Sequence, residues 1–315
     1  MSIKYKCANA NHMQKRRSKM KKIISFCVLL LTMVPIILLG CTSKDKTEVE
    51  SNKLQVAVSI SPIKEFVEYI GGDKVEVNSV VPDNVEAHDF ELKTRDSENI
   101  QSKKLFIYNG VDMEHWVDDL KKIIDESDSN VKFIDSSIKS NIIDDNGKKD
   151  PHLWLSLEEA QNQCRVIADA LIEVDSENKD YYESNYNNFK NQANELLANY
   201  KDKFKDVPNK NFITAHKAFG YLCRDFDLNQ KSLKDIYGEG EPTAKTYEAL
   251  ANFCNENGIK IIFSESSESS KEAETLAKEI NGNVEKLYSL EGKVEGKTYF
   301  EAMEENLDKI LNALK

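Results

Sequence analysis

The hydrophobic positions of the chain follow two alternating spacings from Leu54 onward. Short runs rich in β-branched residues predict buried strands, and between them apolar residues recur three and four positions apart, as in helices that bury one face. Strands that alternate with helices indicate mainly parallel sheets covered by helices. The predicted strands span residues 54–60, 75–81, 104–109, 131–135, 211–215, 230–236, 259–263 and 283–289. The predicted helices in the same regions span residues 62–70, 94–103, 115–124, 218–226, 244–258, 271–282 and 298–314.

This pattern predicts two α/β lobes, residues 53–155 and 207–315, joined by a helical segment, residues 156–206, that has no strand signal. In that segment, Ser156 and Glu159 have the spacing of a capping box that begins a first helix. A second helix extends for about 34 Å at 1.5 Å per residue and carries an apolar stripe. The stripe consists of Tyr182, Tyr186, Phe189, Ala193, Leu196 and Tyr200. It persists for only about three heptads, so we expect it to pack within its own protein rather than in a coiled-coil dimer.

The first forty residues differ from the rest of the chain. A basic head precedes a seventeen-residue apolar run, IISFCVLLLTMVPIILL, which Pro35 interrupts and Gly40 closes. This arrangement predicts an export signal, since the run is only marginally long enough to span a bilayer. Its end, LLGC, resembles the lipobox of bacterial lipoproteins, which implies cleavage before Cys41 and a lipid on its sulfur. Met20 is an alternative start, and the charged residues 41–52 are expected to form a flexible tether.

The net charge narrows the range of partners. The whole chain carries −11, and the first forty residues hold eight basic and no acidic residues, so their removal leaves −19. A strongly acidic protein repels nucleic acid and attracts cations over its whole surface. We therefore expect an exported protein with no nucleic-acid partner.

Three histidines fall where ligands bind in α/β proteins. His88 and His216 follow predicted strands, and His152 lies in the loop-like segment DPHLWLS. Glu265 and Glu291 also follow strands, and the carboxyl ends of strands border the ligand crevices of open α/β sheets. Three neutral imidazoles and one carboxylate are a ligand set suited to Zn²⁺. Successive members of the set His88, His152, His216 and Glu291 lie 60–75 residues apart in the sequence, so spacing alone does not establish a metal site.

The remaining cysteines and the fourth histidine of the exported part have plainer explanations. Cys164, Cys223 and Cys254 fall at apolar positions of predicted helices, where cysteine acts as a small buried hydrophobe. A disulfide between Cys223 and Cys254 is left open by the sequence. His115 lies at the start of a predicted helix, and we expect it to be a solvated surface residue.

In four segments taken in order, the chain resembles the zinc- and manganese-binding lipoproteins of metal-uptake ABC transporters (cluster A-I, the metal-binding-lipoprotein family). The segments are VPDNVEAHDFE, DPHLWLS, HKAFGYL and SLEGKVEGKTYFEAMEENLDKI, and the resemblance runs from Leu54 to Lys315. It implies two α/β lobes bridged by one long helix, with the metal in the cleft between them. It also implies that His88, His152 and His216 are ligands. Manganese-selective members carry a carboxylate where His216 stands, so three histidines imply the zinc-type branch.

The same resemblance assigns the fourth ligand to Glu291. Many zinc-binding members have an aspartate in an L-D-P-L segment, whereas LYSLE resembles the branch with a metal-binding glutamate in S-P-L-E, although Ser289 departs from its proline pattern. Glu265 is the reserve ligand, or a residue that orients an imidazole. Many zinc-binding members also have a histidine-rich loop before the second motif. Here that stretch, SNIIDDNGKKD, is short and acidic, and we expect its aspartates, including Asp150, to lie in a solvated loop.

Together these features predict a receptor. A lipid on Cys41 would hold the protein, as a monomer, at the outer face of the cell membrane, where it captures Zn(II) and delivers it to an ABC-type permease. Its affinity is expected to fall as the pH drops through about 6.5, where imidazoles gain protons. Manganese(II) or iron(II) as the cargo and an added adhesin role are alternatives. A secreted zinc hydrolase would need an open coordination position and a base such as Glu265, and the sequence has no H-E-x-x-H, so we expect no enzyme.

Overall fold

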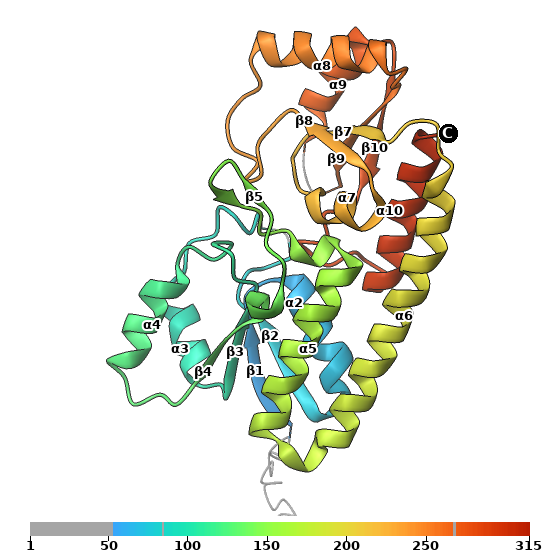
Figure 1. Cartoon of the computed structure of the whole chain (residues 1–315). Coiled ribbons are helices and arrows are strands. Elements are labelled where there is room, and N and C mark those ends of the chain that lie inside the picture. The colour runs from blue at the N-terminus through green and yellow to red at the C-terminus, as the bar shows by residue number, and fades with distance from the viewer. Residues whose placement is uncertain (1–52, 84, 267–268) are drawn as a thin grey trace, which may run out of the picture. The chain divides into compact units, whose positions relative to one another are not determined.

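The computed structural model describes residues 53–315, apart from residues 84, 267 and 268 (Figure 1). The predicted export signal, Cys41 and the tether lie outside these residues and stay predictions. Within the described part of the chain, no helix combines the length and the apolar character that crossing a bilayer requires.

The first sheet has four parallel strands in the order β2-β1-β3-β4. The strands are β1 (Leu54–Val58), β2 (Val75–Ser79), β3 (Leu105–Tyr108) and β4 (Lys132–Asp135). The associated helices are α2 (Ser61–Gly71), α3 (Thr94–Gln101) and α4 (Val117–Asp125), with 3-10 turns at Gly72–Lys74 and Ser136–Lys139. All four residues of β3 are buried, as expected of a central parallel strand with both faces covered.

The second sheet repeats this strand order as β8-β7-β9-β10, again with all strands parallel. The strands are β7 (Asn211–Thr214), β8 (Asn229–Ser232), β9 (Ile261–Glu265) and β10 (Asn283–Leu287). The associated helices are α7 (Gly220–Phe226), α8 (Ala244–Glu256), α9 (Lys271–Glu279) and α10 (Tyr299–Ala313). In both sheets the chain turns to one side of the first strand and then to the other, which creates a topological switch point. The predicted fold class is confirmed.

Two long helices connect the sheets. A 3-10 turn, Leu153–Leu155, precedes α5 (Leu157–Val174), and another, Ser176–Asn178, leads into α6 (Lys179–Lys205). With 27 residues, α6 is about 40 Å long and packs against α2, α5 and α10 (Figure 1). Its buried residues are Tyr182, Phe189, Ala193, Leu197, Tyr200 and Phe204. The stripe packs within this chain as predicted: Tyr186 and Leu196 are partly buried against the core, and Leu197, which was not predicted, is buried beside them.

The start of α5 matches the predicted capping box only in part. The Ser156 hydroxyl accepts a hydrogen bond from the backbone N–H of Glu159 at 3.0 Å. The Glu159 carboxylate does not complete the box but pairs with Arg224 of α7. The Ser156 hydroxyl also donates to Asp225. Because Arg224 and Asp225 belong to the helix after β7, the first turn of α5 is bound to the second lobe.

A continuous hydrophobic core connects the two sheets. One cluster of buried side chains includes residues of β1, α2, α5, α6 and α10, and a smaller one lies between the second sheet and α8 and α9. On α6, the ring of Phe189 contacts Phe66 and Phe300 at centroid distances of 5.4 and 4.8 Å. A shared, densely packed core resists large rotation of one lobe against the other. The three cysteines that the sequence placed in helices are buried and free, so the disulfide that it left open does not form: Cys164, Cys223 and Cys254.

The acidic stretch before the second motif is not the plain loop that the sequence indicated. Strands β5 (Asp144–Asp145) and β6 (Lys148–Lys149) form a small antiparallel hairpin. Asn146 and Gly147 turn its tip with φ angles of 58° and 88°. Asn-Gly is the pair that this left-handed two-residue turn favours, so the signal was present in the sequence.

Candidate metal centre

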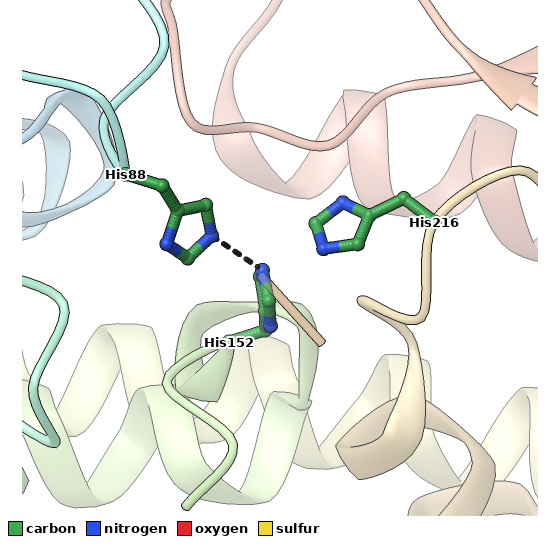
Figure 2. A group of neighbouring side chains, drawn as sticks. All are labelled: His88, His152 and His216. Atoms are coloured by element: carbon green, nitrogen blue, oxygen red, sulfur yellow. Dashed lines mark hydrogen bonds between the residues drawn. The ribbon is translucent and has the colours of Figure 1, made fainter. Parts of the chain in front are cut away.

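Three histidines from distant parts of the chain converge on one point (Figure 2). His88 lies in the loop after β2, His152 directly before a 3-10 turn, and His216 two residues beyond β7. The ring centroids of His152 and His216 are 4.9 Å apart, and the His88 ring lies 5.3 and 5.9 Å from these two. The Nε2 atoms of His88 and His152 are 3.3 Å apart. The structure thus brings together the three histidines that the sequence singled out.

Asp150 orients the ring of His152. Its Oδ1 lies 2.8 Å from His152 Nδ1 and also accepts a hydrogen bond from the backbone N–H of His152 at 3.0 Å. With the ring proton on Nδ1, the lone pair of Nε2 is left for a metal. The expectation of a solvated carboxylate is wrong, because Asp150 is 2% exposed. An aspartate that bonds to the backbone two residues on is a common turn, and the Asp-Pro-His sequence carried that signal.

Glu265 stands in the same relation to His216. Its Oε1 lies 2.8 Å from His216 Nδ1, and both side chains are nearly fully buried. Glu265 ends β9, which is the neighbour of β7, so the pair lies at the switch point of the second sheet. The other ring nitrogen of His216, Nε2, lies 3.0 Å from the carbonyl oxygen of Ile236. Glu265 is therefore placed to orient an imidazole.

Glu291 approaches the histidines from the loop after β10. Its Oε1 lies 3.8 Å from Nε2 of His152, and the residue is 8% exposed. The indole N–H of Trp154 donates to the carbonyl of Ser289 at 2.8 Å and holds the loop in place. Because Trp154 follows His152 by two residues, the segment that carries His152 also positions the loop that carries Glu291.

The backbone around Glu291 is unusually constrained. Leu290 has a φ of 60°, in the left-handed region that residues with large side chains seldom adopt. Gly292 packs so closely that a Cβ atom there would lie 2.3 Å from the carbonyl oxygen of Asp83. Strain of this kind persists where the surroundings hold it and is common at functional sites. Together, these two residues fix the position of the Glu291 backbone.

The surroundings of His88 lower its pKa, so that its ring stays neutral and able to bind a cation. Burial, followed by the neighbouring rings of His152 and His216, lowers the pKa of His88 from 6.5 to about 3. The His88 ring is therefore neutral near pH 7 and retains a lone pair. His115, in contrast, is exposed and is not part of the donor groups in the described residues.

Donor atoms that lie within 4.8 Å of one another form three overlapping groups in the described part of the chain. The groups are His88, His152 and His216; His216, Glu265 and Glu291; and Glu86, His88 and Glu291. Taken together, the groups hold three imidazoles and three carboxylates. Donor sets that include several imidazole nitrogens fit Zn²⁺, whereas Mg²⁺ and Ca²⁺ prefer oxygen donors throughout. Sequence reasoning missed Glu86, and its place two residues before His88 is the signal that could have found it.

A loop of the second lobe covers the histidines. The ring of Tyr237 lies 5.7 Å from that of His88, and its hydroxyl donates to the carbonyl of Lys149 at 3.3 Å. Two ion pairs of 2.7 Å tie the β5–β6 hairpin to the same lobe: Lys148 with Asp235, and Asp145 with Lys217. The hairpin therefore holds the covering loop over His88.

A buried polar network supports the His152 loop from behind. Asn109, which follows β3, donates through Nδ2 to the carbonyl of Pro151 at 2.9 Å. Gln163 of α5 donates to Asn109 Oδ1 at 2.9 Å. The carboxylate of Glu114 accepts from two consecutive backbone amides, beginning at Asn109, at 2.8 and 3.0 Å, and burial raises the pKa of Glu114 to about 7. These buried hydrogen bonds restrict the movement of the loop.

Comparison with known proteins places this centre in a family. Residues 56–313 match the family described as ZnuA, zinc-uptake complex component A, periplasmic. The high-affinity zinc uptake system protein ZnuA of Bacillus subtilis is 31% identical over 312 residues, which cover 93% of this chain and 96% of that protein. The manganese ABC transporter substrate-binding lipoprotein PsaA of Streptococcus anginosus is 28% identical over 310 residues, with coverages of 94% and 99%.

A solved structure agrees with these relatives. The laminin binding protein Lmb of Streptococcus agalactiae, described as a bifunctional protein with adhesin and metal transporting activity, has a TM-score of 0.79 and 30% identity. The alignment covers 84% of this chain and all of that one. The family match spans most of the chain, from β1 to the end of α10. The chain therefore belongs to the zinc-uptake complex component A family of metal-binding solute-binding proteins.

Proposed function

We propose that this protein is an extracytoplasmic receptor that captures Zn(II) and delivers it to the membrane permease of an ABC-type importer. The observation that carries the proposal is that three imidazoles and a carboxylate converge, in overlapping groups whose ligand atoms lie within 4.8 Å of one another. Three of these side chains are buried: His152, His216 and Glu291. This donor set suits zinc better than harder cations. The family, and the zinc-uptake name of the Bacillus subtilis relative, support the same cargo.

The proposed ligands are Nε2 of His88, Nε2 of His152, one ring nitrogen of His216 and a carboxylate oxygen of Glu291. Asp150 would orient the ring of His152 by accepting the proton of Nδ1, and Glu265, whose Oε1 lies 2.8 Å from Nδ1 of His216, would hold the second ring through its charge. With Nδ1 of His216 directed at Glu265, Nε2 is the nitrogen left for the ion, and it would exchange the carbonyl of Ile236 for the metal.

Four protein donors make a carrier rather than a catalyst. Zinc enzymes keep one coordination position open for water or substrate, whereas a closed set of four leaves none. The hydrolase alternative would need Glu265 as a free base, and that carboxylate is buried against His216. Capture and release of the ion are therefore the activity that the donor geometry supports best.

The predicted lipid anchor and the named relatives bear on where the protein works, on its cargo and on an added adhesin role. Lipid attachment at Cys41 would hold a monomeric receptor beside its permease, and the Streptococcus anginosus relative is named a lipoprotein. That relative is also named for manganese, but three histidines favour the softer zinc ion. An added adhesin role, as in the name of the Streptococcus agalactiae protein, stays a prediction.

Metal content measured by mass spectrometry tests the proposal. We expect about one zinc ion per chain in the unmodified protein and in His115→Ala, whose histidine is exposed. His216→Ala should retain less than about a tenth of that zinc, because one of four ligands is lost. Equal zinc in His216→Ala and the unmodified protein would remove His216 from the site. If the protein held manganese or iron in place of zinc, the proposed cargo would be wrong. If it held no metal at all, the proposal that it is a metal receptor would be contradicted.

A further inference from the structure

Metal donors continue outward from the histidine cluster. A carboxylate oxygen of Glu86 lies within 4.8 Å of the ligand atoms of both His88 and Glu291. Those two residues are proposed zinc ligands, whereas Glu86 is not. The molecule therefore offers two overlapping donor sets, an inner one with His152 and His216 and an outer one with Glu86, which share His88 and Glu291.

The two sets differ in their exposure to solvent. Glu86 and His88 are partly exposed, whereas His152 and His216 are 0% and 1% exposed. Glu291, at 8%, lies between these extremes. An ion that moves from solvent to the buried rings would therefore meet the Glu86 set first.

A cleft of about 730 Å³ reaches the outer set. Its lining includes Glu86 and Glu291, and none of the histidines in the described part of the chain. The charged side chains that line it are Asp83, Glu86, Glu272, Glu291, Glu295, Lys234 and Lys293. The excess of carboxylates raises the local concentration of cations, and the cleft directs them to the carboxylates rather than to the rings.

The chemistry of the cargo makes such an outer position useful. Zn²⁺ arrives with bound water, and removing a charged ion from water is costly until protein donors replace that water. The two inner rings are buried and held by carboxylates, so they cannot move out to meet a hydrated ion. A partly exposed carboxylate can bind the ion while water still fills its other positions.

We propose that Glu86 is a receiving ligand, which holds the incoming ion with His88 and Glu291 before the ion moves inward to His152 and His216. This inference rests on the proposed zinc-binding function. In the inward step, the Glu86 oxygen and the remaining water leave the ion as the two imidazole nitrogens bind it. Because Glu86 is absent from the final set, it accelerates both capture and release and leaves the equilibrium affinity nearly unchanged.

Stopped-flow fluorescence of Glu86→Gln tests this step. The ring of Trp154 lies 5.3 Å from that of His152 and should report zinc arrival in the inner set. Excess chelator added to the zinc-loaded protein measures release. We expect the association and dissociation rate constants each to fall about tenfold in Glu86→Gln, with Kd within about twofold of the unmodified protein.

Glu295→Gln is the matched control, because it removes the same charge from the same cleft at a residue outside the three donor groups. We expect its association rate constant to change by less than about twofold. Equal rates in the two variants would overturn the ligand role and leave charge attraction alone. A tenfold weaker Kd with unchanged association would also overturn it, since Glu86 would then be a permanent ligand. If the unmodified protein bound no zinc, the proposed function would fail first, and this inference with it.

Discussion

His152 and His216 differ from His88 in how the protein holds them. Each of the first two is fully buried, with a carboxylate oxygen 2.8 Å from its Nδ1. His88 is partly exposed, and the rings of the other two histidines and of Tyr237 lie around it. The inner half of the centre is thus oriented before the ion arrives, whereas the outer half consists of side chains that can adjust. Such a division suits a receptor that must bind its cargo firmly and also release it.

The two inner histidines reach the same arrangement by different routes. In the first lobe, Asp150 lies two residues before His152, and a local turn brings the carboxylate back to the ring. In the second lobe, Glu265 comes from the strand beside the one that precedes His216. The two lobes share one strand order, yet each positions a carboxylate beside its histidine differently. The first lobe uses a contact within one loop, and the second uses a contact between neighbouring strands.

Removing either orienting carboxylate should produce the largest effect. In Asp150→Asn and Glu265→Gln, an inner ring loses the carboxylate charge 2.8 Å from its Nδ1, so zinc affinity should fall about ten- to a hundredfold. Competition with a chromophoric chelator measures the change. Asp144→Asn is the control, because that carboxylate is exposed and lies outside the three donor groups. An unchanged affinity in both inner variants would show that the rings do not need orientation.

The pH dependence of the free energy of unfolding should reveal the contribution of His88. The pKa of His88 is about 3 in the folded protein and near 6.5 when unfolded, so the unfolded chain takes up the proton first. Stability that is present above pH 6.5 is therefore lost as the pH falls from about 6.5 toward 3. Between pH 7.5 and 5.5, the metal-free protein should lose about 1 kcal/mol more than His88→Gln, as measured by urea unfolding. Equal losses would mean that His88 accepts a proton as readily when folded.

Breaking an ion pair of the covering loop should have the smallest effect. Lys148 and Asp235 are half exposed, and exposed pairs contribute little. In Lys148→Ala, zinc release into chelator should accelerate about two- to threefold, because Tyr237 covers His88 less firmly. Lys148→Arg, which keeps the charge opposite Asp235, should leave the rate near that of the unmodified protein. An unchanged rate in Lys148→Ala would separate the ion pair from the cover over His88.

Hydrophobic periodicity predicted most of the fold, because buried strands and helices repeat their contacts at fixed spacings. It was least accurate where the pattern continues past an element: residues 230–236 were predicted as a strand, but β8 ends at Ser232. On α6 it identified Leu196, which is partly buried, but missed the more deeply buried Leu197, since both positions fit a helical face. The β5–β6 hairpin was missed because two-residue strands carry too little pattern, although Asn146 and Gly147 indicated its turn.

The candidate donors were predicted from their places after strands and from the family resemblance. Their convergence could not be derived from spacing, because it depends on how two sheets face one another. Asp150 was misjudged and Glu86 was missed for a related reason: the direction of a side chain in a loop is set by tertiary contacts and not by periodicity. In both cases a carboxylate within two residues of a candidate histidine was the available signal.

A crystal structure of the zinc-loaded protein, with anomalous scattering at the zinc edge, tests the central claim most directly. We expect one ion at about 2.0–2.2 Å from a nitrogen of each of His88, His152 and His216 and an oxygen of Glu291, with Glu86 no longer bound. An ion held elsewhere, or one that leaves any of the three imidazoles uncoordinated, would contradict the proposed centre.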